Sequence, residues 1–482
     1  MASLLGVKRR WLVLAAISIA TAATAMSASG GRHVLVRPLP FAHNVAGDKA
    51  LAFPPDTNYC LTNLGIHCYQ PAQLVKAYNL APLFASGITG RGKTIVIVDS
   101  FGSPTIANDL HVFDQTFGLP DPPSLKTYQP AGPVPPFDPT NADMVGWAQE
   151  TTLDVEWAHV FAPGANIVVL ATPVSETEGV TGFPEIVKSE NWAIDHGIGD
   201  VISMSFGATE QTFPNAQSIQ SLRSAFFNAR EHHVALLAGT SDAGATDYQL
   251  NLNDLYTFPV SAWPATDPLV TAIGGTQLTL DLAGNRLAPD VVWNDGFGAG
   301  GGGLSTVFKR PGFQSHVAGT VGRARGVPDI SGSSAVDGAV VYYYTFVRPG
   351  FHLVGGVSEA TPEFAGMVAL ADQANHGRIE DLNKALYRLG YDQGLVDVTQ
   401  GDNTVTFQNS DGITYTVHGF SAGPGYDLAS GLGTFDGAGL VAALAGADRG
   451  DHGGGHGNGG GSGSGGGDHT VHRGNPQGPI TP

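Results

Sequence analysis

Short apolar runs alternate with helix-compatible segments through the middle of the chain, and this alternation is the strongest constraint on its fold. Continuous β-branched and aliphatic runs, which are typical of strands buried on both faces, occur at 94–98, 167–170, 201–204 and 234–237. Between them lie predicted helices at 143–161, 184–196 and 215–232. The alternation predicts an α/β fold with a largely parallel sheet and helices on both faces. Residues 120–139 contain eight prolines, which predicts an exposed loop.

The charge balance excludes two classes of partner. The chain has 42 Asp and Glu residues against 24 Lys and Arg, a formal net charge of −18. Such a charge repels nucleic-acid phosphates and anionic membranes, so we expect neither as a partner. We expect a monomer.

The first residues are typical of an export signal. Lys8, Arg9 and Arg10 precede an apolar run at 11–25, and this run ends in small residues that suit signal-peptide cleavage. A membrane anchor is the alternative, but the run is shorter than the ~20 apolar residues of a membrane span. The sequence therefore predicts a signal peptide at 1–28 and a secreted, extracellular protein.

The composition changes abruptly near residue 447, which predicts a disordered tail rich in glycine and histidine at 447–482. Before it we expect an N-terminal segment at 29–67 and a single large domain at 68–446. Cys60 and Cys68 are the only cysteines. In an exported protein they are expected to form one local disulfide, and two reduced cysteines are the alternative.

Ser358 lies in a glycine-led segment, Gly355 to Pro362, at the start of a predicted helix over 361–375. The positive end of a helix is a good place for a nucleophilic hydroxyl, although a serine there is also a common helix cap.

On the predicted helix 143–161, Glu150 and Asp154 are four residues apart and so share one face. If that face is buried, the two carboxyls must share a proton, an arrangement suited to acid–base catalysis; two solvated acids are the alternative.

Asp242 follows the predicted strand 234–237 within Gly239 to Gly244. The carboxyl end of a strand is where α/β sheets place ligand sites, and a turn-forming Asp is the alternative. Asp99 also ends a predicted strand, but no His-Gly-Thr-His segment supplies a partner histidine, so we interpret Asp99 as a structural or supporting residue.

Together these segments resemble the sedolisin family of serine-carboxyl peptidases, which have a subtilisin-like fold and use glutamate in place of histidine as the base. Ser358 falls on the serine of the family's G-T-S-A-x-x-P motif, although Val357 and Glu359 depart from it. The resemblance spans roughly residues 68–444 and includes the segments 270–276, 301–305 and 327–331. The folded propeptide domain typical of the family has no counterpart in the short segment 29–67.

The resemblance implies a role for each residue. Ser358 would attack the scissile carbonyl, Glu150 would accept its proton, and Asp154 would orient Glu150. Asp242, in its protonated form, would donate a hydrogen bond to the oxyanion. Residues 203–207 resemble the strand that pairs with the substrate backbone.

The resemblance also implies one structural Ca²⁺ ion. Asp397 and Asp427 would supply carboxylates, and Val398, Gly423 and Gly425 would supply backbone carbonyls. Two unrelated turns are the alternative.

The function that the resemblance implies is that of a secreted, acid-acting serine-carboxyl endopeptidase with polypeptide substrates. The alternatives are a tripeptidyl-peptidase of the same family and an inactive secreted binding protein on the same scaffold.

Overall fold

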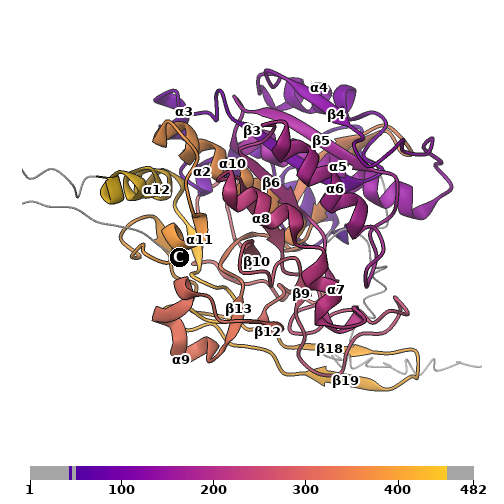
Figure 1. The fold of residues 1–482 in the computed structure, drawn as a ribbon. Coiled ribbons are helices and arrows are strands. Elements are labelled where there is room, and N and C mark those ends of the chain that lie inside the picture. The colour runs from indigo at the N-terminus through magenta and orange to yellow at the C-terminus, as the bar shows by residue number, and fades with distance from the viewer. Residues whose placement is uncertain (1–42, 46–49, 453–482) are drawn as a thin grey trace, which may run out of the picture.

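The computed structural model describes residues 43–45 and 50–452 (Figure 1). The predicted signal peptide lies outside the described residues, as do residues 453–482 of the predicted tail. In the part that is described, no helix combines the length and the apolar character needed to cross a membrane.

The centre of the fold is an eight-stranded sheet in the order β11-β10-β8-β6-β3-β5-β4, with β14 paired to β10. The pairs are parallel except for β10 with β11, which is antiparallel. The strands are β3 (Thr94–Ser100), β4 (Leu125–Tyr128), β5 (Asn166–Thr172), β6 (Val201–Met204), β8 (Ala235–Gly239), β10 (Thr271–Gln277), β11 (Val291–Val292) and β14 (Ile330–Ser333). The predicted largely parallel sheet is confirmed.

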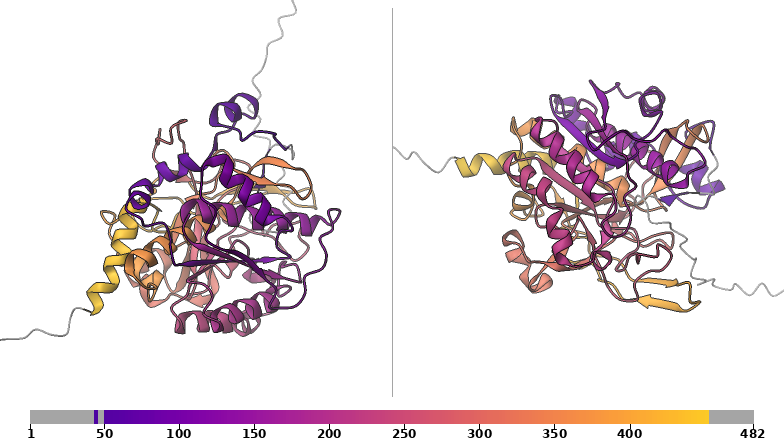
Figure 2. Two further views of the ribbon diagram at one scale, coloured as in Figure 1. Left: turned by 90° about the horizontal axis from the view of Figure 1, so that it is seen from above. Right: turned by 45° about the vertical axis from the view of Figure 1, so that its right-hand side comes forward.

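Helices cover both faces of this sheet, as the left view of Figure 2 shows. On one face, Ile95 and Ile97 of β3 pack in a core with α5 (Ala142–Phe161) and α10 (Val357–Asn375). On the other face, Val96 and Val98 pack with α6 (Phe183–Asp195) and α8 (Ser224–Glu231). Successive strand residues point to opposite faces, so the continuous apolar runs in the sequence reflect burial on both sides.

Three predicted elements differ from the structure. The helix predicted at 215–232 is two helices, α7 (Ala216–Ser221) and α8, and they are separated at Arg223, whose side chain pairs with Asp267 at 2.6 Å. The expected loop 120–139 contains β4, which avoids all the prolines and lies at the sheet edge. The helix α10 starts at Val357 rather than at 361 and continues through Pro362.

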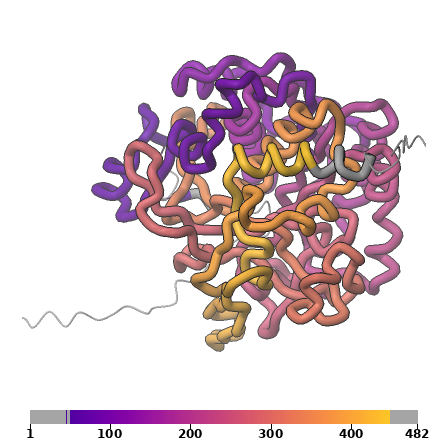
Figure 3. Tube along the Cα trace, turned by 90° about the vertical axis from the view of Figure 1, so that its left-hand side faces the viewer, coloured from indigo at the N-terminus to yellow at the C-terminus, as the bar shows by residue number. Residues whose placement is uncertain are grey.

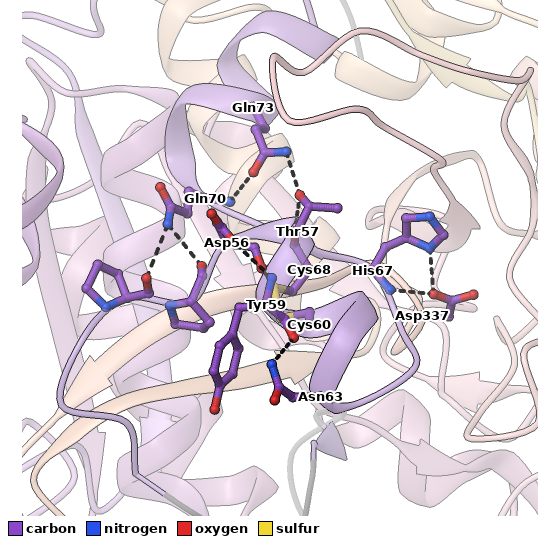
Figure 4. Close-up of a disulfide and its surroundings, with 12 residues drawn as sticks. Asp56, Thr57, Tyr59, Cys60, Asn63, His67, Cys68, Gln70, Gln73 and Asp337 are labelled. Carbon is purple, nitrogen blue, oxygen red and sulfur yellow. Dashed lines mark hydrogen bonds and ion pairs between the residues drawn. A yellow bond between two sulfur atoms is a disulfide. The ribbon is translucent and has the colours of Figure 1, made fainter.

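The N-terminal segment contributes to a second sheet in the order β1-β16-β15-β2. Its strands are β1 (His43–Asn44), β2 (Cys68–Tyr69), β15 (Ala339–Tyr344) and β16 (Gly350–Gly355), and helix α1 (Thr57–Asn63) packs beside them. The predicted disulfide between Cys60 and Cys68 is present (Figure 4). Next to it, the Thr57 hydroxyl donates to the Cys68 carbonyl at 2.8 Å. Since β16 leads directly into α10, this second sheet supports the helix that carries Ser358.

The other elements lie around this frame. They are α2 (Pro71–Ala77), α3 (Ala81–Ala85), α4 (Ile106–Phe117), β7 (Ala208–Thr209), β9 (Ala262–Trp263), β12 (Gly303–Lys309), α9 (Ala318–Val321), β13 (Ala324–Val327), α11 (Leu382–Leu386), β17 (Leu395–Val396), β18 (Val405–Gln408), β19 (Thr414–Val417), β20 (Thr434–Phe435) and α12 (Gly437–His452), with short 3₁₀ turns at Glu210–Thr212 and Gly312–Val317. The yellow helix α12 (Figure 3) continues six residues past the predicted domain end at 446. It packs against α10.

Candidate active site

The four predicted catalytic side chains come from three elements and are all buried. Glu150 and Asp154 lie on α5, Asp242 lies in the loop after β8, and Ser358 is the second residue of α10. Ser358 and both α5 carboxyls are 0% exposed, and Asp242 is 6% exposed. The α5 face that carries the two acids is therefore buried, as their proposed chemistry requires.

Close packing of α10 on α5 brings Ser358 towards the two carboxyls. Gly366 makes this approach possible, because a Cβ atom at that position would lie 2.5 Å from the Cβ of Phe161. A side chain at 366 would push the two helices apart. The separation of the proposed nucleophile from its base thus depends on a glycine two turns away.

Ser205, directly after β6, connects the serine to the acid pair. The Ser358 hydroxyl donates to the Ser205 carbonyl over a long 3.4 Å, and the Ser205 hydroxyl donates to Asp154 Oδ1 at 2.8 Å. Ser205 therefore fixes one oxygen of Asp154 and also holds the Ser358 hydroxyl in place. Because the bond from Ser358 is long, little is lost when the hydroxyl rotates towards Glu150.

The Glu150 carboxyl is held in an environment that disfavours its charge. Burial, and then the neighbouring Asp154, raise the pKa of Glu150 well above its ordinary value, while the nearby Ser358 hydroxyl lowers it. That hydroxyl is close to Glu150 but makes no hydrogen bond of normal geometry with it, since its bond goes to Ser205. Burial and Asp99 likewise raise the pKa of Asp154, and the Ser205 hydroxyl opposes the shift. Glu150 and Asp154 thus behave as one coupled pair that retains a proton to higher pH than free acids do.

Asp99, at the end of β3, is a third buried carboxyl beside this pair. Burial raises its pKa to about 7, and the Thr151 hydroxyl opposes that shift. Asp99 contributes to the raised pKa of both Glu150 and Asp154. Its position agrees with the supporting role that the sequence suggests.

Asp242 is anchored to the helix that carries Ser358. Its Oδ1 accepts the backbone N–H of Val357, the first residue of α10, at 2.8 Å. The glycine-rich segment 298–303 packs on the Asp242 loop, because a Cβ at Gly301 would lie 2.0 Å from the Thr240 carbonyl oxygen. These glycines serve close backbone packing around Asp242.

Sequence analysis missed three features of this region. Ser205 was noticed only as part of a substrate-binding strand, and its bond to Asp154 could not be read from the sequence. A second pair of fully buried acids, Glu359 and Glu363, lies on α10, and its spacing of four residues is the same signal that identified Glu150 and Asp154. A third buried group of acids consists of Glu176, Glu178 and Asp247; Asp247 raises the pKa of both glutamates, and Glu176 also raises that of Glu178.

The residues of the predicted calcium site meet at one glycine turn. Gly425 N–H donates to Asp397 Oδ2, and Gly423 N–H donates to Asp427 Oδ2, each at 3.0 Å. The Val398 side chain packs in a small core with Ala429. Asp397 Oδ1 is buried and has no hydrogen bond of normal geometry, which suits a cation ligand. Within the described ranges, no group of three or more His, Cys, Asp or Glu side chains could hold a metal, so an ion here would depend on backbone carbonyls.

Two curated peptidases are similar to this chain in sequence. No model of a known protein family matches the chain. Kumamolisin from Bacillus sp. (strain MN-32) is 30% identical over 390 residues, which are 78% of this chain and 63% of kumamolisin. Sedolisin from Pseudomonas sp. (strain 101) is 31% identical over 279 residues, 55% of this chain and 44% of sedolisin. The chain thus spans less than two thirds of the length of these curated relatives.

A solved structure extends the similarity to the fold. The structure of Pseudomonas sedolisin, a serine-carboxyl proteinase complexed with two molecules of pseudo-iodotyrostatin, has a TM-score of 0.63 and 25% identity to this chain. The match covers 79% of this chain and 98% of the sedolisin chain. In sequence and in fold, the chain is similar to the sedolisin family of serine-carboxyl peptidases.

Proposed function

We propose that this protein is a serine-type peptidase that cleaves internal bonds of polypeptides under acid conditions. The observation that carries the proposal is a buried arrangement of three groups. Ser358 lies beside Glu150, and Ser205 links Ser358 to Asp154 through hydrogen bonds. A serine hydroxyl with a coupled carboxyl pair is a nucleophile with a base. The names of the relatives, kumamolisin and sedolisin, support the same class of activity.

In the proposed mechanism, Ser358 Oγ attacks the carbonyl carbon of the scissile bond, and its proton passes to Glu150. Asp154 orients Glu150 and accepts part of the proton's charge through the coupled pair. Asp242 in its acid form donates to the developing oxyanion. Glu150 then gives its proton to the leaving amine, and a water molecule repeats the sequence to release the acyl group.

Exopeptidase action is a second candidate, because tripeptidyl-peptidase 1 of Canis lupus familiaris is 27% identical over 319 residues, 61% of this chain and 51% of that protein. An inactive binding protein is the third candidate, since Val357 and Glu359 flank Ser358 where the family motif has Thr and Ala.

We also propose that the protein is secreted, on the basis of the charged and apolar pattern in residues 1–28.

Digestion of an unfolded protein at several pH values distinguishes these candidates. Mass analysis of the products shows internal cleavage for an endopeptidase and successive tripeptides for an exopeptidase. The Ser358→Ala variant, which lacks the hydroxyl, is the control and should release nothing. If the unmodified protein cleaves no substrate at any pH, the peptidase proposal fails and a binding function gains support.

Activity should be maximal between roughly pH 3 and 5.5, because the Glu150–Asp154 pair needs to lose only one of its two protons for Glu150 to act as the base, and a free carboxyl (pKa near ~4.3) titrates well below histidine (near ~6.5). Asp242 must stay protonated to donate to the oxyanion, so activity should fall as Asp242 ionises. Asp242→Ala removes the donor and should lower kcat by about 10²–10³-fold. Asp242→Asn keeps a donor that does not titrate and should flatten the alkaline fall. A pH–rate profile with its maximum at pH 7 or above would contradict both assignments.

We further propose one structural Ca²⁺ ion held by Asp397 and Asp427 with the carbonyls of Val398, Gly423 and Gly425. Chelation should lower the Tm by several degrees, and calcium should restore it. Since Asp427 also accepts N–H bonds from Ala429 and Ser430, a lower Tm in Asp427→Ala is not diagnostic by itself. The diagnostic result is that the Tm of this variant no longer responds to calcium, whereas Asp411→Ala, in an exposed hairpin turn, keeps the response. If the unmodified protein has the same Tm with calcium and with chelator, the site does not exist.

A further inference from the structure

Helix α5, which carries the proposed base, is hydrogen-bonded to strand β15 of the second sheet. Near the C-terminal end of the helix, Trp157 Nε1 donates to the Val341 carbonyl at 3.1 Å, and Glu156 Oε2 accepts the Tyr343 N–H at 3.0 Å. Strand β15 pairs with β16, and β16 leads into α10, the helix of the proposed nucleophile. The β15–β16 hairpin is therefore bonded to the helix of the base and continuous in the chain with the helix of the nucleophile.

One contact of this hairpin lies next to Glu150. Gln149 Nε2 donates to the hydroxyl of Tyr344 at 2.8 Å. Neighbouring side chains on a helix point about 100° apart, so Gln149 reaches the hairpin while Glu150 faces the active site. Because Gln149 directly precedes Glu150, a hydrogen bond that fixes Gln149 also restricts movement of the helix turn that carries the base.

Stacked rings fix the Tyr344 side chain, which is fully buried. The centre of the His352 ring lies 3.9 Å from that of Tyr344 at an interplanar angle of 8°, and the centre of the Phe346 ring lies 4.5 Å from it at 17°. Phe346 in turn meets Phe137, in the proline-rich loop that precedes α5, edge-on at 5.6 Å. The phenol cannot swing without breaking these ring contacts, so Tyr344 is a fixed acceptor for a side chain of α5.

The position of Glu150 relative to Ser358 needs such a constraint. Gly366 lets α10 approach α5 closely, which sets the distance between the two helices. Close packing alone leaves two helices some freedom to slide and turn against each other. Proton transfer requires Ser358 Oγ and a Glu150 oxygen at hydrogen-bond distance, and a misplacement of about 1 Å can cost about 10²-fold in rate.

We propose that Gln149 and Tyr344 are positioning residues, and that the hydrogen bond between them holds the turn of α5 that carries Glu150 in place beside Ser358. This inference rests on the proposed peptidase function for its kinetic readout only. The pair acts through the backbone of the helix and not on the substrate. Loss of the bond should therefore slow the chemical step and leave substrate binding unchanged.

The test uses Tyr344→Phe, which removes the hydroxyl and keeps the stacked ring, and Gln149→Met, which keeps the side-chain length and removes the donor. Each should lower kcat and the single-turnover rate by about 10-fold, with KM changed by less than about two-fold. The double variant should lose no more than either single variant, because both changes break the same bond. Losses that multiply in the double variant, or a loss that appears in KM and not in kcat, would overturn the inference.

Tyr343→Phe is the matched control. It makes the same chemical change at the next residue of β15, whose ring lies on the opposite face of the hairpin, 4.9 Å from the ring of Phe351. The kcat of this variant should equal that of the unmodified protein. If Tyr343→Phe and Tyr344→Phe lower kcat equally, or if Tyr344→Phe has no effect, the bond to Gln149 does not position the base.

A second readout does not need activity. Infrared difference spectra between the protein and its Glu150→Gln variant isolate the Glu150 carboxyl band. With Tyr344→Phe in both proteins the band should broaden or shift, because the carboxyl then occupies a wider range of positions; with Tyr343→Phe it should stay the same. If Tyr344→Phe leaves the band unchanged, the inference is wrong even when the protein is an active peptidase. If the protein is inactive and the band changes, the pair acts as inferred and only the proposed function fails.

Discussion

Glu150→Gln should lower kcat by about 10⁴-fold or more, the order seen when one member of a hydrolytic triad is removed. Glutamine has the shape of glutamate but cannot accept the Ser358 proton. Since Glu150 is fully buried and makes no hydrogen bond of normal geometry, the uncharged amide should leave the fold intact. Single-turnover and steady-state rates on a peptide substrate, with the Tm as a check of folding, measure the effect.

Glu156→Gln is the control for this experiment. Glu156 is also fully buried on α5, but it accepts the N–H of Tyr343 at 3.0 Å and has no contact with Ser358 among the interactions described. Its replacement should leave kcat within a few-fold. The kcat of Asp154→Asn should lie between those of Glu150→Gln and Glu156→Gln, because this change keeps the Ser205 contact but removes the charge that orients Glu150. Activity that survives Glu150→Gln would show that another group is the base.

The protein should be most stable near pH 4 and should lose at least about 10 °C of Tm by pH 8. Several buried carboxyls have raised pKa values: about 7 for Asp99, Asp247 and Asp372, and about 8 for Glu190. Burial is the first cause in each case. In the unfolded chain these acids ionise near ~4, so from that pH upwards the folded state binds more protons and the free energy of unfolding falls as pH rises.

One acid whose pKa rises from ~4 to ~7 accounts for a loss of up to about 4 kcal/mol across this window. The pKa values of three surface acids, Asp138, Asp254 and Asp281, are lowered and act in the opposite direction, but solvent screens these groups because none of them is buried. Calorimetry from pH 3 to 8 measures the trend. Glu190→Gln should raise the Tm relative to the unmodified protein at pH 8 more than at pH 4, while the exposed Glu231→Gln should not. A Tm that rises between pH 4 and pH 8 would contradict the prediction.

Much of the fold could be predicted from local pattern. The apolar runs at 94–98, 167–170 and 201–204 became β3, β5 and β6 within about two residues at each end, and the helix predicted from 143 starts at Ala142. These elements are buried on a whole face or on both faces, so burial imposes a regular period on the sequence. The break at Arg223 was not predicted in this way; Arg223 pairs there with Asp267, a residue distant in the sequence.

The sequence by itself determined which residues could do the chemistry: the four-residue spacing of Glu150 and Asp154, the serine at a glycine-led helix start, and the acid after a strand. Only the tertiary structure decided how they meet. It placed Ser205 between Ser358 and Asp154, Asp99 beside the acid pair and Val357 N–H on Asp242. The physical reason is that spacing along one helix fixes neighbours within that helix, whereas contacts between α5, α10 and the strand ends depend on how the whole core packs.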